Sequence, residues 1–446
     1  HILPRKSADL RMMGVRKRER ERRPAKDSGG RKVRSGDQPS PAKAETWGWL
    51  LVTVVVVLIA VSVSSVILYR SKTTDPGPDP TRNLAPVPHG SVKTDVDYQE
   101  ILRENSEVTK NGTYRHYTYP VLGYITPWNS KGYEMAKRFA NKFTHLSPVW
   151  YDLKSQGSGL VLEGRHNADP GWILDIRQRG GALVLPRVVL EALPKEMLRK
   201  KKLMDKAVEL IVSECREMDY DGIVLESWSR WMAYGVLFDP DLRNKAIEFV
   251  KQLGQALHSV PSARNNVQHL QLIYVIGPPY SEVLQSHDFG PKDLRSLSND
   301  VDAFSLMMYD FSGPQNPGPN APLKWIQSTL QLLLGSGKGA QTLAHKILVG
   351  LNYYGNDFVI SEDTGGGAII GRDYLSLLEK HKPQLQWEKN SGEHFFLYVE
   401  DDGSRHVIFY PTLMSIFLRL EEARVQGTGI SIWEIGQGLD YFFDLL

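Results

Sequence analysis

Short apolar stretches alternate with longer amphipathic stretches along residues 118–446. The short stretches are almost continuously hydrophobic, which is typical of parallel strands that are buried on both faces. The stretches between them, such as KGYEMAKRFANKF and MDKAVELIVSECREM, repeat apolar side chains every three or four positions and predict helices. The eight predicted strands lie within residues 121–128, 143–151, 182–191, 220–228, 270–279, 301–311, 346–355 and 429–436.

Eight strand–helix repeats predict an α/β fold of the (β/α)8 type, a TIM barrel over residues 118–446. A doubly wound open sheet is the alternative, but no glycine-rich nucleotide-binding turn follows the first strand. A small insertion is expected after the seventh strand, within residues 365–410. Its last part predicts two β-hairpins, with turns at residues 390–392 and 401–403 that each contain a glycine.

The first 117 residues have a different composition, and we expect them to lie outside the barrel. Residues 1–46 hold 14 Lys and Arg against 6 Asp and Glu and predict a disordered basic arm. Residues 47–69 carry no charge, and at about 1.5 Å per residue a helix of that length crosses a bilayer. Residues 70–117 are expected to form a stalk or linker, in which residues 70–95 are Pro-rich and extended and a short helix within residues 96–115 leads into the folded body.

The charge on either side of residues 47–69 predicts a signal anchor with a cytosolic N-terminus. The barrel would then lie in the lumen of the secretory pathway or outside the cell, as in a single-pass type II membrane protein. Asn111, in the sequence Asn-Gly-Thr, is a glycosylation acceptor that is usable only on that side. The chain begins with His1 rather than Met, so we expect further residues before it.

Composition excludes several classes of function. Apart from the basic arm the chain is mildly acidic, so we expect no nucleic-acid partner for the main domain. Cys215 is the single cysteine, which excludes an intramolecular disulfide and speaks against a Cys-containing zinc site. It lies on an apolar helical face and is expected to be a buried thiol. We expect neither a metal nor a cofactor.

Polar and aromatic residues gather where the predicted strands end. In a TIM barrel the carboxyl ends of the strands form the functional face, and aromatic rings together with carboxylates are suited to binding sugars. The pattern therefore predicts a carbohydrate cleft. The strand-end residues are Trp128, Asn129, Trp150, Glu191, Glu226, Trp228, Tyr309, Asp310, Tyr354, Trp433 and Glu434.

Several motifs resemble glycoside hydrolase family 18, the chitinase barrel family. They are VLGYITPWNSKGY, FTHLSPVW, FSLMMYDFS, VGLNYYG, EHFFLY, HVIFYPTL and GISIWEIGQGLDYFFDLL. The resemblance covers residues 118–446 and is closest to the chitinase-domain-containing subgroup, which includes the stabilin-interacting chitinase-like lectin. It implies a TIM barrel that binds chitin-like oligosaccharides.

The fourth strand departs from the family pattern. Active members read Asp-Gly-x-Asp-x-Asp-x-Glu, in which the Glu protonates the leaving oxygen and the preceding Asp holds the substrate's N-acetyl group. In this chain Val224 stands at the inner Asp, Glu226 at the next Asp and Trp228 at the acid. An indole cannot donate the required proton. A register shifted by two residues makes Glu226 the acid but places Gly222 and Val224 at the two Asp positions.

Because strand side chains alternate faces, we expect residues 222, 224, 226 and 228 all to point inward. Glu226 would bind a sugar, or would pair with Arg187 of the neighbouring strand. Trp228 would either stack on a sugar or fill the vacated subsite. The resemblance implies further sugar contacts from Tyr309 and Asp310, which retain the Met-x-Tyr-Asp pattern with Met307, and from Trp433 beneath the innermost ring. Tyr124 and Tyr354 are weaker candidates of the same kind.

Three functions follow. The first is a non-hydrolytic, lectin-like domain for N-acetylglucosamine-type oligosaccharides. The second is an atypical glycoside hydrolase that uses Glu226 or Glu434 together with Asp310. The third is a scaffold that binds a protein partner in the lumen.

Overall fold

The computed structural model describes residues 90–107, 114–264, 267–279, 281, 283–335, 342–360 and 365–446. The predicted basic arm, membrane segment 47–69 and acceptor Asn111 lie outside these residues. Among the described residues, no helix combines the length and the apolar character needed to cross a membrane.

The main sheet is a curled, largely parallel sheet, and it contains a strand at each of the eight predicted ranges. Seven strands follow one another without a break in the order β6-β7-β8-β9-β10-β16-β1. The third predicted strand is divided into β5 and β6. The sequence did not predict the antiparallel hairpin of β3 and β4, which begins at the last residue of the second predicted strand. The sheet consists of β1 (Val121–Ile125), β2 (His145–Pro148), β3 (Tyr151–Gln156), β4 (Gly159–Glu163), β5 (Leu183–Val184), β6 (Arg187–Leu190), β7 (Gly222–Glu226), β8 (Gln271–Ile276), β9 (Ala303–Leu306), β10 (Ile347–Asn352) and β16 (Gly429–Trp433).

The two halves of the third strand close the sheet into a barrel. β5 pairs with β2 on one side, and β6, which follows after two residues, pairs with β7 on the other. Backbone hydrogen bonds continue across this junction, from Asp221 N to Val184 O at 3.0 Å and from Val224 N to Pro186 O at 3.1 Å. Since β16 pairs with β1 in parallel, the strands form the TIM barrel that the eight repeats predict.

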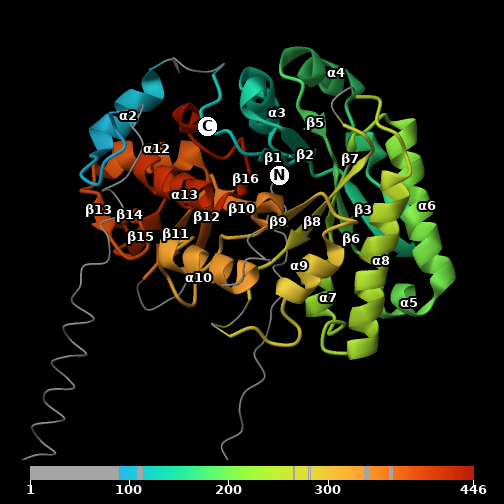
Figure 1. The fold of residues 1–446 in the computed structure, drawn as a ribbon. Coiled ribbons are helices and arrows are strands. Elements are labelled where there is room, and N and C mark those ends of the chain that lie inside the picture. Colours follow the sequence, from blue (N-terminus) through green and yellow to red (C-terminus); the bar gives the residue numbers. More distant parts are fainter. Residues whose placement is uncertain are drawn as a thin grey trace, which may run out of the picture. The chain divides into compact units, whose positions relative to one another are not determined.

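Helices follow the strands along the chain and cover the outside of the sheet (Figure 1). Several begin at a capping residue: Asp169, for example, accepts a hydrogen bond from Trp172 N at the start of α4. The helices are α2 (Tyr98–Ser106), α3 (Ser130–Arg138), α4 (Pro170–Arg179), α5 (Pro194–Arg199), α6 (Lys201–Glu217), α7 (Trp228–Ala233), α8 (Pro240–His258), α9 (Pro291–Leu297), α10 (Leu323–Leu334), α12 (Gly371–His381) and α13 (Leu413–Gln426).

The insertion after the seventh barrel strand is a separate antiparallel sheet. Its strand order is β12-β11-β15-β14-β13, so the hairpins predicted at residues 386–409 are confirmed, whereas the sequence did not predict the first two strands. The strands are β11 (Gly355–Val359), β12 (Gly365–Ile369), β13 (Gln386–Glu388), β14 (Glu393–Val399) and β15 (Arg405–Phe409). Glu393 joins this sheet to the barrel, since it accepts a hydrogen bond from the buried Arg419 of α13 at 2.9 Å.

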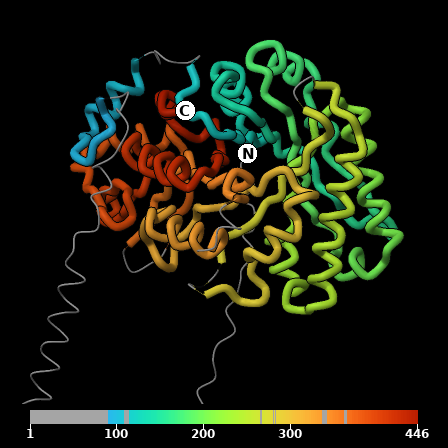
Figure 2. The backbone as a smooth tube through the Cα atoms, viewed as in Figure 1, coloured from blue at the N-terminus to red at the C-terminus, as the bar shows by residue number. Residues whose placement is uncertain are grey.

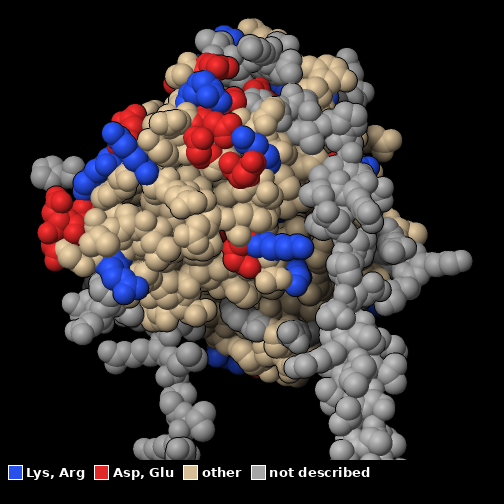
Figure 3. All heavy atoms as spheres, turned by 90° about the vertical axis from the view of Figure 1, so that its left-hand side faces the viewer, with Lys and Arg blue, Asp and Glu red and all other residues tan. Residues whose placement is uncertain are grey.

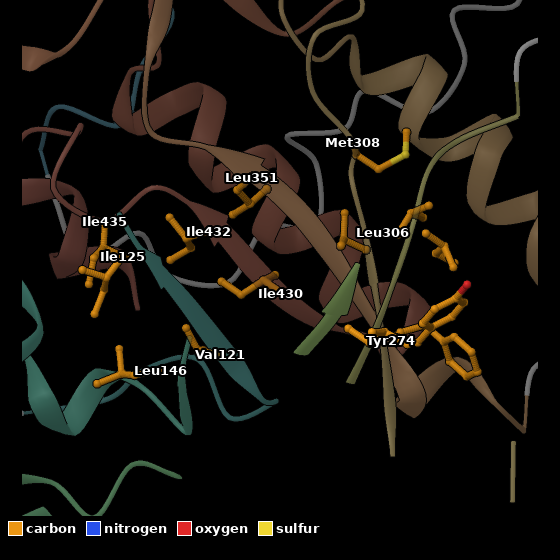
Figure 4. Close-up of a cluster of buried hydrophobic side chains, with 14 of the residues drawn as sticks. Val121, Ile125, Leu146, Tyr274, Leu306, Met308, Leu351, Ile430, Ile432 and Ile435 are labelled. Atoms are coloured by element: carbon orange, nitrogen blue, oxygen red, sulfur yellow. The ribbon is translucent and has the colours of Figure 1, made fainter. Parts of the chain in front are cut away.

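Alternation along the strands divides the apolar side chains into two cores. Val121, Ile125 and Ile430 belong to the large core between the strands and the helices, part of which is shown in Figure 4. Leu122 and Val224 belong to a smaller core inside the barrel. Residues of even number on β1 and β7 therefore face inward, as the period of two predicts.

The segment before the first strand packs against the end of the chain. In Figure 2 the blue segment that contains α2 runs beside the orange and red segments, and Ile101 of α2 is buried in the main core. His116 N also donates a hydrogen bond to the Leu446 carbonyl at 2.9 Å. The short helix predicted within residues 96–115 is present as α2, and its apolar face is buried against the body rather than held apart from it as part of a linker.

Charged side chains on one face of the body are mixed in sign. Figure 3 shows Lys and Arg beside Asp and Glu, separated by uncharged residues.

Candidate functional site

Glu226 and Arg187 form an ion pair inside the mouth of the barrel. Glu226 is the last residue of β7 and Arg187 the first of β6, and the side chains are only 12% and 11% exposed. Ser229 also donates a hydrogen bond to Glu226 Oε1 at 3.3 Å. Of the two roles predicted for Glu226, pairing with Arg187 is the one that the structure shows.

Arg187 also covers the aromatic residues of the mouth. Its guanidinium carbon lies 4.9 Å from the centre of the Trp433 ring and 5.6 Å from the centre of the Tyr124 ring, which is the geometry of cation–π contacts. The two rings themselves are 5.4 Å apart. One face of Trp433, the ring that the family resemblance places beneath the innermost sugar, is thus occupied by a protein side chain.

Tyr124 lies too deep to be a wall of the cleft. It is 2% exposed, and its hydroxyl donates to Ser305 Oγ at 2.8 Å, from which a further hydrogen bond leads to Ser431 Oγ at 3.1 Å. Burial raises the pKa of the Tyr124 hydroxyl. The predicted sugar contact from Tyr124 does not agree with this position, because its ring forms part of the barrel interior beneath Trp433.

Tyr309, Asp310 and Tyr354 meet at the ends of the sixth and seventh strands. The Tyr354 hydroxyl donates a hydrogen bond to Asp310 Oδ1, and the rings of Tyr309 and Tyr354 stand edge to face at 6.3 Å. Asp310 is exposed at the mouth, yet the neighbouring protein excludes water from its carboxyl group, and this desolvation raises the pKa of the carboxyl group. The hydrogen bond from Tyr354 acts to lower it. The structure therefore brings these three predicted site residues together.

The insertion fixes the backbone of Asp310. Asp310 has a φ of 61°, a left-handed conformation that Asp tolerates better than most residues. Its N–H donates to Asn320 Oδ1 at 2.8 Å, and the N–H of Asn320 donates to Glu393 Oε2 at 3.0 Å. Glu393 in turn is held by Arg419, so a buried polar chain connects the mouth to the second sheet.

Trp228 does not share the inward face of Glu226, and that prediction is wrong. The strand ends at Glu226, the backbone leaves the extended region at Ser227 (φ −144°, ψ −28°), and α7 begins at Trp228. The indole is 3% exposed. It packs edge to face against Phe289 at 5.2 Å and beneath the guanidinium of Arg243 at 5.4 Å. It is therefore a buried packing residue rather than an open platform.

A cavity of about 430 Å³ lies beside this cluster, within the size range of small-molecule sites. Met307, Tyr309 and Asp310 line it from the sixth strand end, and the edge of Trp228 reaches it from α7. The other lining residues are Ser229, Met232, Gly277, Pro278, Pro279, Asp288, Phe289, Phe311 and Trp325.

A second hollow of about 500 Å³ adjoins the first and shares Pro279, Phe311 and Trp325 with it. The rings of Phe311 and Trp325 are 5.1 Å apart, and Phe311 is 49% exposed. The sequence analysis missed both. Phe311 directly follows Tyr309-Asp310, so its proximity to a strand end was a signal that would have found it. Trp325 lies in the first turn of α10, and no strand end in the sequence marks it.

Glu434 directly follows Trp433 in the chain, and its side chain is fully buried. It accepts hydrogen bonds from Asn129 Nδ2 at 2.7 Å and from Thr126 N at 3.5 Å, next to the first turn of α3. Burial raises the pKa of its carboxyl group to about 7, although these donors act to lower it. With an exposed fraction of 0%, Glu434 contacts protein rather than ligand, so its predicted role as an alternative catalytic acid does not fit its position.

The carboxyl groups at the mouth do not form the neighbouring pair of the family pattern. Substrate-assisted hydrolysis needs two neighbouring carboxyl groups facing the sugar, one of which stays protonated. In this chain the inward position on β7 before Glu226 is Val224, Glu226 is neutralised by Arg187, and Trp228 belongs to a helix. What remains open to a ligand is an aromatic hollow with Asp310 at its edge.

Comparison with known proteins defines the class first. The structure matches a chitinase from Chromobacterium violaceum with a TM-score of 0.59 and 21% identity, over 74% of this chain and 98% of the other. A family 18 chitinase from Cycas revoluta, solved in complex with (GlcNAc)3, matches with a TM-score of 0.59 and 13% identity, over 73% of this chain and 97% of the other. These likenesses show the fold, that of the chitinase-like TIM barrels.

The sequence then identifies the family. The model of glycosyl hydrolases family 18 matches residues 195–438, more than half of the chain, and the chain belongs to this family. An uncharacterized glycosylase, YvbX, of Bacillus subtilis is 25% identical over 47% of this chain and 59% of its own length. The cortical fragment-lytic enzyme of the same organism is 25% identical over 37% of this chain and 39% of its own. The chain thus spans less than two thirds of these curated relatives.

Proposed function

We propose that the chain is a carbohydrate-binding member of family 18 that does not hydrolyse its ligand. The observation that carries this proposal is the ion pair of Arg187 and Glu226, whose guanidinium group also stacks on Trp433. It neutralises the carboxylate at the mouth and covers the ring face on which a sugar would be distorted for cleavage. Replacing either partner of such a buried pair is costly, because it leaves the other charge without compensation.

The ligand is a chitin-like oligosaccharide of N-acetylglucosamine units. Support comes from Tyr309 and Asp310, which keep the family pattern and line the 430 Å³ cavity, and from the (GlcNAc)3 bound by the Cycas relative. Phe311 and Trp325 stand between this cavity and the adjoining hollow, so successive sugars would extend across their rings. The proposal places the chain near the chitinase-like lectins of the family.

Calorimetric titration with chitotriose and chitohexaose tests the proposal. We expect binding without release of shorter sugars, and a loss of affinity of about tenfold in Phe311→Ala, which corresponds to about 1.4 kcal/mol for one aromatic contact. Tyr114→Ala is the matched control, since Tyr114 is an aromatic residue that is 64% exposed and lies outside both hollows. An absence of heat at millimolar ligand, or equal losses in both variants, would refute the proposal.

The alternative is an atypical glycoside hydrolase, which the names of the Bacillus relatives, a glycosylase and a lytic enzyme, favour. Asp310, whose carboxyl pKa is raised, would be its acid. A panel of fluorogenic chito-oligosaccharides decides between the two functions. Turnover that disappears in both Asp310→Asn and Glu226→Gln would establish hydrolysis, whereas a flat panel in a chain that still binds sugar would exclude it.

We also propose that residues 47–69 anchor the protein and that the barrel faces the lumen or the cell exterior. The absence of charge over these residues and the basic arm before them support this topology. Expression in a secretory cell tests it: an endoglycosidase should increase the gel mobility of the wild-type chain but not that of Asn111→Gln. A mobility that the enzyme leaves unchanged in both chains would contradict luminal exposure of this acceptor.

A further inference from the structure

Two histidines and an aspartate converge at the end of the barrel opposite the mouth. His258 is the last residue of α8, His269 precedes β8, and Asp302 directly precedes β9. Because β8 and β9 are parallel, their amino ends lie at the same edge of the barrel. One possible ligand atom from each of the three side chains lies within 4.8 Å of the other two. We propose that these three residues bind a divalent transition-metal ion of the zinc type.

The geometry of the three side chains supports this proposal. His258 Nε2 lies 2.9 Å from Asp302 Oδ2, and the two imidazole rings lie 4.0 Å apart between centroids at an angle of 37°. Zinc bonds of about 2.0–2.1 Å in a tetrahedral site place neighbouring ligand atoms roughly 3.3 Å apart. Side-chain movements on the order of 1 Å therefore bring all three atoms into one coordination sphere, and a water molecule would complete it.

Hydrogen bonds behind the ligands prepare two of them for a metal. His269 Nδ1 lies 3.1 Å from the Leu270 carbonyl oxygen, which can only accept, so Nδ1 carries the proton and Nε2 keeps its lone pair free. A backbone carbonyl is a common second partner of metal-binding histidines. The N–H of Leu272 donates to Asp302 Oδ2 at 2.8 Å, which fixes the carboxylate.

The backbone around the site is also held in place, and the site is open to solvent. His269 forms an antiparallel bridge with Pro261, and Leu270 N donates to the Val260 carbonyl at 3.1 Å. The His258 and Asp302 side chains are 20% and 23% exposed, so an ion can enter. Since the cluster lies away from the mouth, the ion would tie the end of α8 to two barrel strands, which is a structural role rather than a catalytic one.

The sequence predicts no metal, because a single cysteine speaks against a Cys-containing zinc site. This set consists of two imidazoles and one carboxylate, a donor set typical of zinc. His258, His269 and Asp302 are spread over more than forty positions, so only the fold brings them together.

Cobalt(II) and zinc titrations of the chelator-treated, untagged protein test the proposal. We expect one equivalent of Co²⁺ to produce the visible absorption of a four-coordinate site, and Zn²⁺ to displace it. At a hundredfold excess of Zn²⁺ over its Kd, the Tm should rise by about 5 °C. In His269→Ala and Asp302→Asn the affinity should fall at least tenfold, whereas His166→Ala, which removes an exposed histidine elsewhere, should leave it unchanged.

Two outcomes would overturn the proposal. One is wild-type protein that shows neither saturable Co²⁺ absorption nor a Zn²⁺-dependent Tm at about 100 µM metal. The other is binding that persists in His269→Ala, which would assign the ion to other histidines. If His269→Ala fails to fold, as far-UV circular dichroism would show, Asp302→Asn gives the same test, because its amide oxygen can still accept from Leu272 N–H.

Discussion

The ion pair of Arg187 and Glu226 allows a quantitative test of how strongly two buried charges at the mouth depend on each other. Both side chains are almost 90% buried, so the loss of one partner leaves the other charge without compensation. For such pairs the loss is about 3–5 kcal/mol of the free energy of unfolding, whereas replacing both partners by apolar residues is nearly neutral. We therefore expect Glu226→Gln and Arg187→Met each to destabilise the protein by about 3 kcal/mol. The double variant Arg187→Met/Glu226→Leu should lose about 1 kcal/mol or less.

Guanidinium unfolding followed by tryptophan fluorescence measures these differences as shifts of the midpoint at constant slope. Comparison of Glu226→Leu, Arg187→Met and the double variant gives the coupling energy directly, which we expect to be about 3 kcal/mol or more. The pair of Arg230 and Glu191 is the matched control, because its side chains are 35% and 31% exposed. Glu191→Gln should lose at most about 1 kcal/mol. Additive losses at Arg187 and Glu226 would refute the reasoning, since they would mean that the two charges do not depend on each other.

Three further predictions concern the surrounding structure. The folded-state pKa of Glu434, about 7, lies above its ordinary value of 4.5, so the folded state binds more protons than the unfolded state between these pH values. The free energy of unfolding therefore falls as the pH rises through this window, by about 3 kcal/mol in total. Urea unfolding of Glu434→Gln at pH 5 and pH 8 should show a smaller difference than the wild type, and an equal difference would contradict the assignment. Gly222→Ala should cost roughly 3 kcal/mol or more in the same assay, because φ is 138° and an added Cβ would lie 2.0 Å from the Gln271 carbonyl oxygen; a loss below about 1 kcal/mol would argue against this close approach. Tyr354→Phe should raise the pKa of Asp310, since it removes the hydrogen bond that favours the ionised form, and a carboxyl NMR titration that shows no rise would exclude that contact.

The sequence predicted those helices, strands and turns in which one physical rule applies to every residue of the element. The eight apolar stretches predicted the eight strands, because a strand covered on both faces must be hydrophobic throughout. Alternation placed Val224 and Glu226 on the inward face, and the turns containing Gly392 and Gly403 predicted two hairpins of the insertion. The loss of the carboxylate pair was equally visible, since it depends only on which residue stands at each position.

Trp228 shows where such local reasoning ends. The period of two holds only while the backbone stays extended, and the sequence does not mark Ser227 as the residue at which β7 gives way to α7. The inner end of the linker could not be predicted for a related reason, because the buried face of α2 has a partner only in the folded body. Neither boundary is set by the residues on either side of it alone.

The sequence by itself thus determined the barrel, its family and the departure of residues 221–228 from the family pattern, because these follow from patterns of neighbouring residues along the chain. Only the tertiary structure decided which side chains contact one another at the mouth of the barrel. Arg187, Glu226 and Trp433 come from three strands, and whether their charges and rings neutralise or expose one another depends on distances across the barrel. The cluster of His258, His269 and Asp302 has the same origin. Contacts between residues far apart in the chain are set by how strands and helices pack, and this packing leaves no periodic pattern in the sequence.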